Sequence, residues 1–234
     1  YTKPPGGLAC ADLDVDGDLD VIFTHSGGAG LITGAPGFYF RNDGALGLVD
    51  VTAQLAPSLS IPRRFFTAVL ADYTGDMLPD LHSAIDFFPD YHCRNAGGGV
   101  LVDVSVLAGT TNKGADMGIA VGDIENDGDL DLYSTNIGTG VLYVNDGQGG
   151  FKDEAVARGV ANWNGPLCVG WGTAFVDFDH DMDQDLVCIG RTNPGFFWRN
   201  LGNGNFGEVQ NHGLDLYGYS LVPFDYDRDG DVDL

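Results

Sequence analysis

The sequence feature that most constrains this chain is a nine-residue segment in which every second residue is acidic. It reads Asp-Leu-Asp-Val-Asp-Gly-Asp-Leu-Asp and runs from Asp12 to Asp20. Carboxylates at this spacing repel one another unless a cation lies between them. Calcium takes about six to eight oxygen ligands, which a loop supplies from acidic positions 1, 3, 5 and 9 around a glycine turn at position 6. The segment therefore predicts a calcium loop, in which position 7 contributes its backbone carbonyl rather than its side chain.

The acidic segment recurs at intervals of about 48 to 60 residues, with full copies starting at Asp123, Asp177 and Asp225 and an altered copy starting at Asp72. A solvated acidic turn without a metal stays open as the alternative, above all for the altered copy. In the full copies the predicted calcium ligands are Asp12, Asp14, Asp16, Asp18, Asp20, Asp123, Glu125, Asp127, Asp129, Asp131, Asp177, Asp179, Asp181, Asp183, Asp185, Asp225, Asp227, Asp229, Asp231 and Asp233. In the altered copy they are Asp72, Thr74, Asp76 and Asp80.

The predicted loops differ in how well they suit the metal. The loops at Asp12, Asp123 and Asp225 combine the acids with the glycine turn, so we expect them to fill first. Met182 replaces the turn glycine of the Asp177 loop, where glycine adopts the required geometry more easily. The Asp72 loop loses a carboxylate and gains a proline, so it is expected to be weakest. The chain is therefore expected to hold about four calcium ions and a fifth, weaker one.

The residues around each loop predict strands rather than the helices of an EF-hand. An EF-hand loop ends in a bidentate Glu at position 12, whereas the corresponding residue here is Phe23, Ser134 or Cys188. Each repeat reads strand, acidic loop, apolar strand, turn, aromatic strand, Asn-x-Gly hairpin and final strand. Four-stranded units of about 50 residues in series are typical of a β-propeller. We therefore predict an all-β fold of four-stranded blades, with the acidic loop between strands 1 and 2 of each blade.

Two motifs carry a resemblance to a known family. The strands before two loops read Gly-Ile-Ala-Val-Gly-Asp over 118–123 and Gly-Thr-Ala-Phe-Val-Asp over 172–177, and the hairpins follow an Asn-x-Gly-x-Gly-x-Phe-x-Asp pattern. The chain thus resembles the FG-GAP/VCBS repeat of integrin α-chain propellers, and more closely the cartilage-acidic-protein and UnbV-like members. The resemblance implies a calcium-bound propeller, commonly of seven blades, used in adhesion or recognition. Met182, the altered second loop and the lack of an UnbV-like segment depart from the family pattern.

The predicted blades form one β-propeller domain over residues 1–234. They cover residues 6–64, 65–114, 115–168 and 169–216, and a partial fifth blade over 217–234 provides one strand and one acidic loop. Four complete blades do not close a ring, and an open array leaves unpaired edges that promote aggregation. We therefore expect the chain to be part of a larger propeller, with further blades or another chain covering the open edges.

The charge of the chain lies mostly in the loops. The sequence has 34 acidic and 11 basic residues and a formal net charge of −23, and about two thirds of the acids fall in the five acidic segments. Nucleic acid and anionic membranes are poor partners for such a chain, since both need a basic surface. No apolar run is long enough to span a membrane. Because calcium in the millimolar range is found outside the cytoplasm, we expect an extracellular, cell-surface or periplasmic protein.

The four cysteines align with apolar positions of the repeat. Cys10 falls where Leu70 falls, and Cys93 where Phe40 falls. We therefore expect the cysteines to fill the core as small apolar side chains. A disulfide between Cys168 and Cys188 stays open but is not predicted.

The end of each blade opposite the acidic loops is the predicted binding face. Successive connections of an antiparallel blade alternate between its two ends, so the turns between strands 2 and 3 gather with the links between blades. Aromatic and arginine side chains there suit recognition of a protein or a glycan, although each could instead pack the links. The predicted face comprises Arg63, Arg64, Phe87, Phe88, Lys113, Trp163 and Arg191.

No catalytic motif is evident in the sequence. It has no nucleophile elbow, no phosphate-binding loop and no His-x-x-x-His pair, and its five histidines share no register in the repeat. Each histidine is more simply explained as a surface or core residue. The alternative function is a lyase-like enzyme acting on an acidic polysaccharide. It would need a base beside a cationic subsite, for which Arg63, Arg64, Lys113 and Arg191 could supply only the charge.

Overall fold

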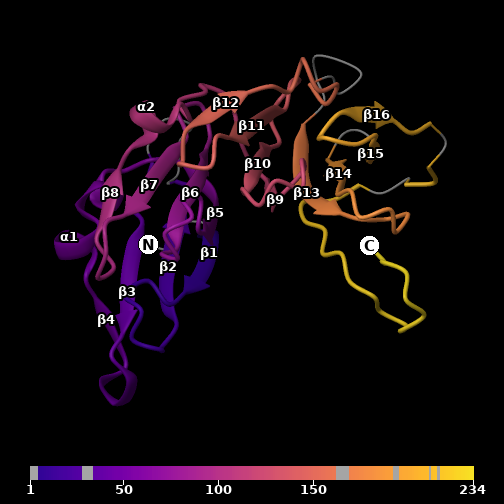
Figure 1. Ribbon diagram of the computed structural model, residues 1–234. Coiled ribbons are helices and arrows are strands. Elements are labelled where there is room, and N and C mark those ends of the chain that lie inside the picture. Colours follow the sequence, from indigo (N-terminus) through magenta and orange to yellow (C-terminus); the bar gives the residue numbers. More distant parts are fainter. Residues whose placement is uncertain (1–4, 28–33, 162–168, 192–194, 211, 215–216) are drawn as a thin grey trace. The chain divides into compact units, whose positions relative to one another are not determined.

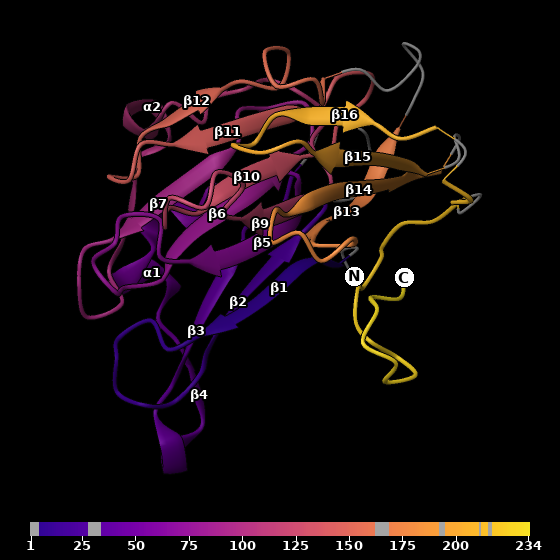
Figure 2. The same ribbon diagram turned by 45° about the vertical axis from the view of Figure 1, so that its right-hand side comes forward.

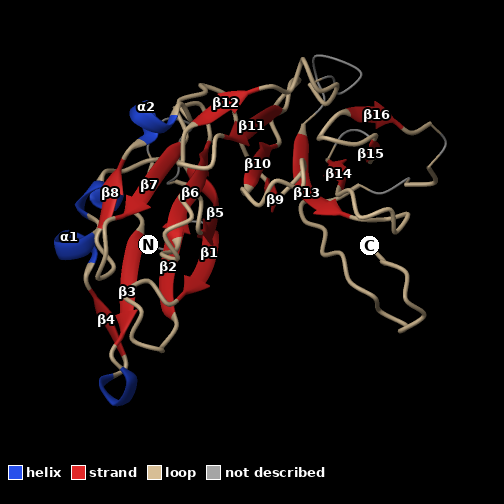
Figure 3. Cartoon of the chain, in the orientation of Figure 1, coloured by secondary structure: helices blue, strands red, loops and turns tan. Residues whose placement is uncertain are grey.

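The structure is a computed structural model that describes residues 5–27, 34–161, 169–191, 195–210, 212–214 and 217–234 (Figure 1). The described residues form sixteen strands, two short α-helices and two 3₁₀ turns (Figure 3). They fall into two compact units, and each is described by itself. Unit 1 consists of Tyr1–Asp116 and Gln148–Gly150, and unit 2 of Met117–Gly147 and Phe151–Leu234.

Unit 1 holds two four-stranded sheets, each with its strands in chain order. The first sheet consists of β1 (Pro5–Ala11), β2 (Asp20–His25), β3 (Phe38–Asn42) and β4 (Leu48–Asp50). The second consists of β5 (Phe65–Ala71), β6 (Asp80–Ile85), β7 (Tyr91–Asn95) and β8 (Leu101–Asp103). The short helical elements are η1 (Gly44–Leu46), α1 (Thr52–Leu55), η2 (Pro57–Ser60) and α2 (Ser105–Ala108). The helices α1 and α2 each follow the fourth strand of a sheet.

Unit 2 repeats the arrangement with two further sheets. The third sheet consists of β9 (Ile119–Gly122), β10 (Asp131–Ser134), β11 (Val141–Asn145) and β12 (Phe151–Asp153). The fourth consists of β13 (Gly170–Val176), β14 (Asp185–Gly190), β15 (Phe196–Asn200) and β16 (Phe206–Glu208). In all four sheets each strand pairs antiparallel with the next one along the chain (Figure 2). Each sheet is thus a β-propeller blade, and the predicted all-β propeller fold is confirmed.

The antiparallel order gives every blade two distinct ends. The acidic loop between the first and second strands and the hairpin between the third and fourth lie at one end, which we call the loop end. The turn between the second and third strands and the link after the fourth lie at the other, the turn end. In the second blade, for example, the 72–80 loop precedes β6 and the 86–90 turn follows it.

Small residues on the first strands let blades pack closely within each unit. In unit 1, β1 packs beside β5, and a Cβ atom on Gly6 would overlap the carbonyl oxygen of Phe65. In unit 2, β9 packs beside β13, and a Cβ atom on Gly118 would overlap the carbonyl oxygen of Trp171. The glycines at the start of these strands are therefore a packing requirement, since only glycine has no Cβ.

Each unit has its own hydrophobic core between its two blades. In unit 1 the core includes the fully buried Ile22, Tyr39, Phe65 and Leu81. In unit 2 it includes Ile124, Tyr133, Leu186, Trp198 and further side chains of the same kind. Most of these residues lie on second and third strands, whose apolar runs are buried more completely than those of the flanking strands; Phe65 begins β5, and Ile124 lies in the acidic loop before β10.

Two sequence predictions about the fold were wrong. Cys93 and Cys188 are buried, but Cys10 is exposed. The neighbouring Ala9 packs against the core, so the alternation of a strand turns Cys10 away. Cys188 is a free thiol, and Cys168 lies outside the described residues.

The second error concerns residues 217–234, which form an acidic loop but no strand. Their pairing is limited to single bridges, from Gly190 to Tyr217 and from Phe224 to Asp233. Tyr217, Val222 and Tyr226 are all more than half exposed. Without a continuous ladder of hydrogen bonds to a neighbouring strand, the predicted strand does not form.

Candidate metal-binding loops

All five acidic loops share one backbone conformation. Position 4 has a positive φ in every loop, and position 6 does as well. The residues at position 4 are Val15, Gly75, Asn126, His180 and Arg228, and those at position 6 are Gly17, Met77, Gly128, Met182 and Gly230. The glycine turn predicted at position 6 is therefore present, and Met77 and Met182 adopt it although methionine rarely does. The positive φ at position 4 could not be predicted from the sequence, because the residues at this position in the five loops have no chemical property in common.

The first acid of each loop caps the loop backbone. Asp12 accepts hydrogen bonds from the backbone N–H groups of Asp16 (3.0 Å) and Gly17 (2.9 Å). Asp16 in turn accepts one from the backbone of Asp18 (2.9 Å). The first acids of the other four loops, Asp72, Asp123, Asp177 and Asp225, also accept backbone N–H groups of their own loops. The acids at positions 1 and 5 thus hold the loop in shape.

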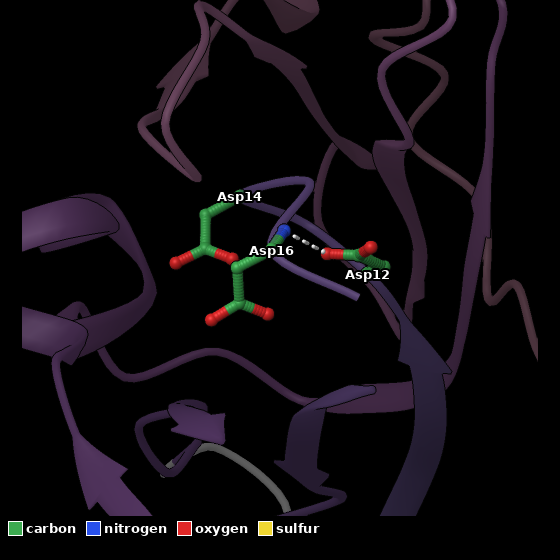
Figure 4. Close-up of side chains that lie close together, drawn as sticks. All are labelled: Asp12, Asp14 and Asp16. Atoms are coloured by element: carbon green, nitrogen blue, oxygen red, sulfur yellow. Dashed lines mark hydrogen bonds between the residues drawn. The ribbon is translucent and has the colours of Figure 1, made fainter. Parts of the chain in front are cut away.

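Three loops bring their first three acids together. In the first loop, one carboxylate oxygen from each of Asp12, Asp14 and Asp16 lies within 4.8 Å of the others (Figure 4). The same holds for the triplet Asp177, Asp179 and Asp181 and for the triplet Asp225, Asp227 and Asp229. The distance suits oxygens around one cation. Several triplets of this chain could therefore hold a metal ion.

Asp14 provides a test of whether a cation fits the first loop. Its Oδ1 is buried and has no hydrogen-bond partner. Burial raises the pKa of Asp14, and the nearby carboxylates, above all Asp16 and Asp20, raise it further. A hard divalent cation would supply the missing partner and offset the repulsion, so the donor set fits such an ion. Asp12, Asp14 and Asp16 are the side chains that would hold it.

The acid at position 9 ties the loop to the rest of its blade. In the first four loops this residue is buried, and each of its two oxygens accepts a backbone N–H. One N–H comes from position 2 of the same loop and the other from the asparagine that opens the hairpin; for Asp131 these are Ile124 (3.1 Å) and Asn145 (2.8 Å). Burial is the main cause that raises the pKa of Asp131 to about 7 and those of Asp80 and Asp185 to about 6. This bracing role was not predicted from the sequence.

The acid at position 7 contacts a neighbouring hairpin or loop in three of the loops. Asp18 and Asp129 lie beside hairpin glycines: a Cβ on Gly44 would be 3.0 Å from a carboxylate oxygen of Asp18, and one on Gly147 would overlap a carboxylate oxygen of Asp129. Asp183 accepts a hydrogen bond from the Asn126 side chain (2.7 Å). These side chains therefore lie against neighbouring hairpins and loops, and the predicted backbone role of position 7 stays a prediction.

Two loops lack a converged triplet among the described residues. In the loop at Asp123, the longer Glu125 side chain forms an ion pair with Arg158, which also pairs with Glu154. In the loop at Asp72, the hydroxyl of Thr74 is buried without a partner, and Asp76 pairs with Arg94. The first three acids thus converge in the Asp177 loop and not in the Asp123 loop, and the predicted order of occupation stays a prediction.

The asparagine of the hairpin joins neighbouring blades within each unit, which the sequence pattern did not indicate. Besides opening its own hairpin, Asn95 donates its side-chain N–H to the carbonyl of Leu13 in the preceding blade (2.8 Å). Asn200 makes the equivalent bond to Ile124 (2.9 Å). Each of these hydrogen bonds ends at the carbonyl of position 2 of an acidic loop, so the neighbouring blade helps to hold that loop in place.

The residues of the predicted binding face lie at turn ends. Arg63 stacks on the ring of Tyr91, with its Cζ 4.6 Å from the ring centroid, and lies 3.6 Å from Asp103. Arg64 forms an ion pair with Asp86 (2.7 Å). The guanidinium of Arg64 also lies over the Phe87 ring, and both Phe87 and Phe88 are exposed. Lys113 is exposed at the turn end of the second blade, Arg191 is exposed after β14 in unit 2, and Trp163 lies outside the described residues.

Known proteins resemble this chain in sequence. The family model for FG-GAP-like repeats matches residues 72–134 and 177–234. Cartilage acidic protein 1 of Mus musculus is 29% identical over 199 residues, which cover 77% of this chain and 30% of that protein. Its counterpart in Xenopus tropicalis is 23% identical over 267 residues, which cover 97% of this chain and 39% of that protein. The chain spans about a third of the length of these relatives.

The fold has a counterpart among solved structures. The structure of an Agrocybe aegerita lectin that recognises non-reducing terminal N-acetylglucosamine aligns with a TM-score of 0.50. The sequence identity is 22%, and the alignment covers 85% of this chain and 50% of the lectin. At this identity the likeness concerns the fold alone. None of the helices among the described residues is long and apolar enough to cross a membrane.

Proposed function

The chain belongs to the FG-GAP-like repeat family, and from this premise we propose that it is an extracellular, calcium-stabilised recognition propeller that binds a protein or a glycan at its turn ends. The main support for the recognition role is the conformation of the turn after β6. It presents the rings of Phe87 and Phe88 to solvent, 59% and 47% exposed, at the end of the blade away from the acidic loop. Exposed aromatic side chains beside arginines are typical of binding surfaces.

Calcium is the metal that the loops suit best. Their side-chain donors are carboxylates, which are hard oxygen ligands that calcium prefers, and the loops contain no cysteine ligand and no paired histidines. The ion would neutralise a triplet and hold the loop end of the blade. Its role would be structural, because the exposed aromatic residues lie at the opposite end. Loops of this kind bind calcium at the millimolar concentrations found outside cells, which supports an extracellular location.

Recognition is favoured over the lyase alternative by the environment of two arginines. A lyase acting on an acidic polysaccharide needs a cationic subsite for the substrate carboxylate. Arg63 and Arg64 each lie beside a carboxylate, Asp103 and Asp86 respectively. Their charge is therefore largely compensated. The lectin that shares the fold supports a glycan as one class of ligand.

The metal part of the proposal is tested by thermal unfolding in 1 mM calcium and after chelation. With a dissociation constant of about 10⁻⁴–10⁻³ M, each occupied site stabilises the protein by roughly 0.4–1.4 kcal/mol, and three converged triplets by about 1–4 kcal/mol. The Asp14→Asn variant should show a smaller calcium effect and, after chelation, a melting temperature at least as high as that of the wild type, since it removes a buried carboxylate that its acidic neighbours repel and that accepts no hydrogen bond from the described residues. If chelation leaves the melting temperature of the wild-type protein unchanged, the metal role is wrong.

The recognition part is tested by probing glycan and protein arrays with the chain in calcium. Binding to a defined set of ligands, lost in the Phe87→Ala variant, would support recognition at the turn end. Incubation with pectic and glycosaminoglycan polymers serves as the control for catalysis. An increase in absorbance at 235 nm would show a lyase and contradict the proposal.

A further inference from the structure

A pocket of about 400 Å³ opens at the turn end of the second blade. Its walls come from the link before β5, the turn between β6 and β7, and the chain around and after β8. Its volume lies within the range of about 300–1,000 Å³ that small-molecule sites occupy. Its lining includes Ile61, Arg63, Phe88, Asp103, Val106 and Thr111. Two members of the predicted binding face, Arg63 and Phe88, thus meet in one cavity.

The polar side of the pocket is a pair of fixed, opposite charges. Arg63 is held by its stacking on Tyr91 and by a hydrogen bond from Nη1 to the carbonyl of Ser58 (3.3 Å). Asp103 is held through Oδ1, which accepts the backbone N–H (3.1 Å) and the hydroxyl (2.7 Å) of Ser105. Neither side chain needs to move to meet a ligand, which lowers the entropy that binding costs.

The distance across the pair indicates which chemical group it binds. Arg63 Nη2 and Asp103 Oδ2 are 3.6 Å apart, too far for a direct hydrogen bond. A guanidinium can only donate hydrogen bonds and a carboxylate can only accept them. A hydroxyl does both, so one hydroxyl, or two on adjacent carbons, can accept from Arg63 and donate to Asp103. The hydroxyl of Thr111, which makes no hydrogen bond to the described residues, adds a third polar group to the lining.

The charge balance selects a neutral ligand. The guanidinium and the carboxylate compensate each other, and Asp90 adds a further carboxylate to the buried side of the pocket. The chain as a whole carries a net charge of −23. The acidic chain would therefore repel an anionic ligand such as a uronate, and the Arg63 guanidinium would repel a cationic ligand.

The apolar side of the pocket suits the flat face of a ring. Phe88, Ile61 and Val106 are all exposed there, 47%, 53% and 82% respectively. The turn that presents Phe88 contains Phe87 at a φ of 63°, a conformation that bulky residues rarely adopt. The strained backbone is held by a hydrogen bond from the Phe87 N–H to the carbonyl of Gly114 (2.8 Å). Such strain is concentrated at functional sites.

We propose that this pocket binds a neutral pyranose, the terminal sugar of a glycan, with its hydroxyls between Arg63 and Asp103 and the C–H face of its ring on Phe88. The inference rests on the proposed recognition function and narrows it to one ligand class and one site. The hydroxyls of a sugar can pair with the planar charged groups of Arg63 and Asp103, and the C–H face of its ring can pack on the exposed apolar surface.

The test measures binding of neutral methyl glycosides to the calcium-loaded chain by saturation-transfer NMR and calorimetry. The panel holds the methyl glycosides of glucose, galactose, mannose and N-acetylglucosamine, with methyl glucuronide as the anionic control. We expect millimolar binding of at least one neutral glycoside and none of the glucuronide. Phe88→Ala and Asp103→Asn should each weaken binding about tenfold or more, whereas Phe224→Ala, which removes an exposed ring in unit 2, should leave it unchanged. Thermal unfolding in calcium confirms that the variants are folded.

The outcomes separate this inference from the proposed function. If no neutral glycoside binds, or if Phe88→Ala and Asp103→Asn bind as well as the wild type, the sugar site is wrong. Array ligands that bind both variants normally would leave recognition standing and place it elsewhere. Protein ligands lost in Phe88→Ala would keep the surface but contradict the sugar class. An array without any ligand, together with no glycoside binding, would refute both.

Discussion

A buried histidine pair in the second blade makes the stability of unit 1 depend on pH. His82 on β6 and His92 on β7 face each other across the sheet, and their Nδ1 atoms are 3.2 Å apart. Both side chains are buried. The equivalent pairs in the other blades, such as Val187 opposite Phe197, are apolar. Burial lowers the pKa of His92 to about 4, and burial and the neighbouring His92 lower the pKa of His82.

The sign and size of the effect follow from these pKa values. The unfolded chain binds a proton on His92 below its ordinary pKa of about 6.5, while the folded chain does so only below about 4. Between the two values the unfolded state binds more protons, so stability is lost as the pH falls. At pH 5 the loss from His92 alone is about 2 kcal/mol, and below pH 4 it reaches about 3.4 kcal/mol. His82 adds to the loss in the same direction.

The assay compares the wild type with a double variant, His82→Val with His92→Leu, which places apolar residues where the other blades have them. Other groups shift with pH as well; the raised pKa of Asp80, for instance, acts in the opposite direction. Both proteins carry those groups, so the difference between them isolates the histidines. A loss of about 2 kcal/mol lowers the melting temperature by roughly 4–8 °C in a domain of this size. The wild type should therefore lose at least that much more than the variant between pH 7 and pH 5.

Parallel melting curves of the two proteins across this pH range would refute the reasoning. They would mean that the pair takes up a proton in the folded state as readily as in the unfolded state. Measurements at pH 7, where His92 is mostly neutral in both the folded and the unfolded state, report chiefly the packing change of the double variant. Calcium is held constant throughout, so that the acidic loops contribute equally to both curves.

Three further predictions follow from single residues. Asp131→Asn should destabilise unit 2 by roughly 2–3 kcal/mol, because its amide cannot accept both backbone N–H groups that the carboxylate accepts, whereas Asp129→Asn, at a half-buried position whose side chain accepts neither of these N–H groups, should change thermal unfolding little. Met182→Gly should stabilise the protein by about 0.5–1 kcal/mol, since Met182 has a φ of 74° that glycine adopts without strain; an unchanged or lower melting temperature would contradict this. In the folded protein a thiol reagent should modify Cys10 and spare Cys93, whose burial raises its pKa to about 12, as peptide mapping by mass spectrometry would show.

The features that the sequence predicts correctly are local and repeated. The spacing of the acids defines the loops, and the alternation of apolar residues defines the strands on either side of them. Because every blade repeats both patterns, their order alone yields the four-stranded sheets. Met182 shows how reliable such a pattern is, since its backbone follows the loop conformation although its side chain does not favour it. The prediction of one domain over residues 1–234 stays a prediction.

The features that the sequence does not predict depend on residues far apart along the chain. The bond from Asn95 to Leu13 joins residues 82 positions apart, and no motif marks its two ends as partners. Glu125 fits the acidic pattern of its loop, but Arg158, which lies 33 residues further along, draws its carboxylate away. The pocket is missed for the same reason, because Arg63, Phe88 and Asp103 come from three separate segments that only the folded blade brings together.

The acids of the first loop have different roles: Asp12 and Asp20 stabilise the loop conformation, and Asp14 is available to bind a cation. Both oxygens of Asp12 and both oxygens of Asp20 accept hydrogen bonds, three of the five from backbone N–H groups of the loop itself and the others from the backbone of Asn42 and the hydroxyl of Tyr39. These bonds fix the loop without a metal. Asp14 accepts none from the described residues. Its buried oxygen has no partner, and burial and the neighbouring acids raise its pKa, so the ionised Asp14 lowers the stability of the metal-free loop. The cation removes this destabilisation once the loop has formed, so we expect calcium to stabilise a blade that is already folded.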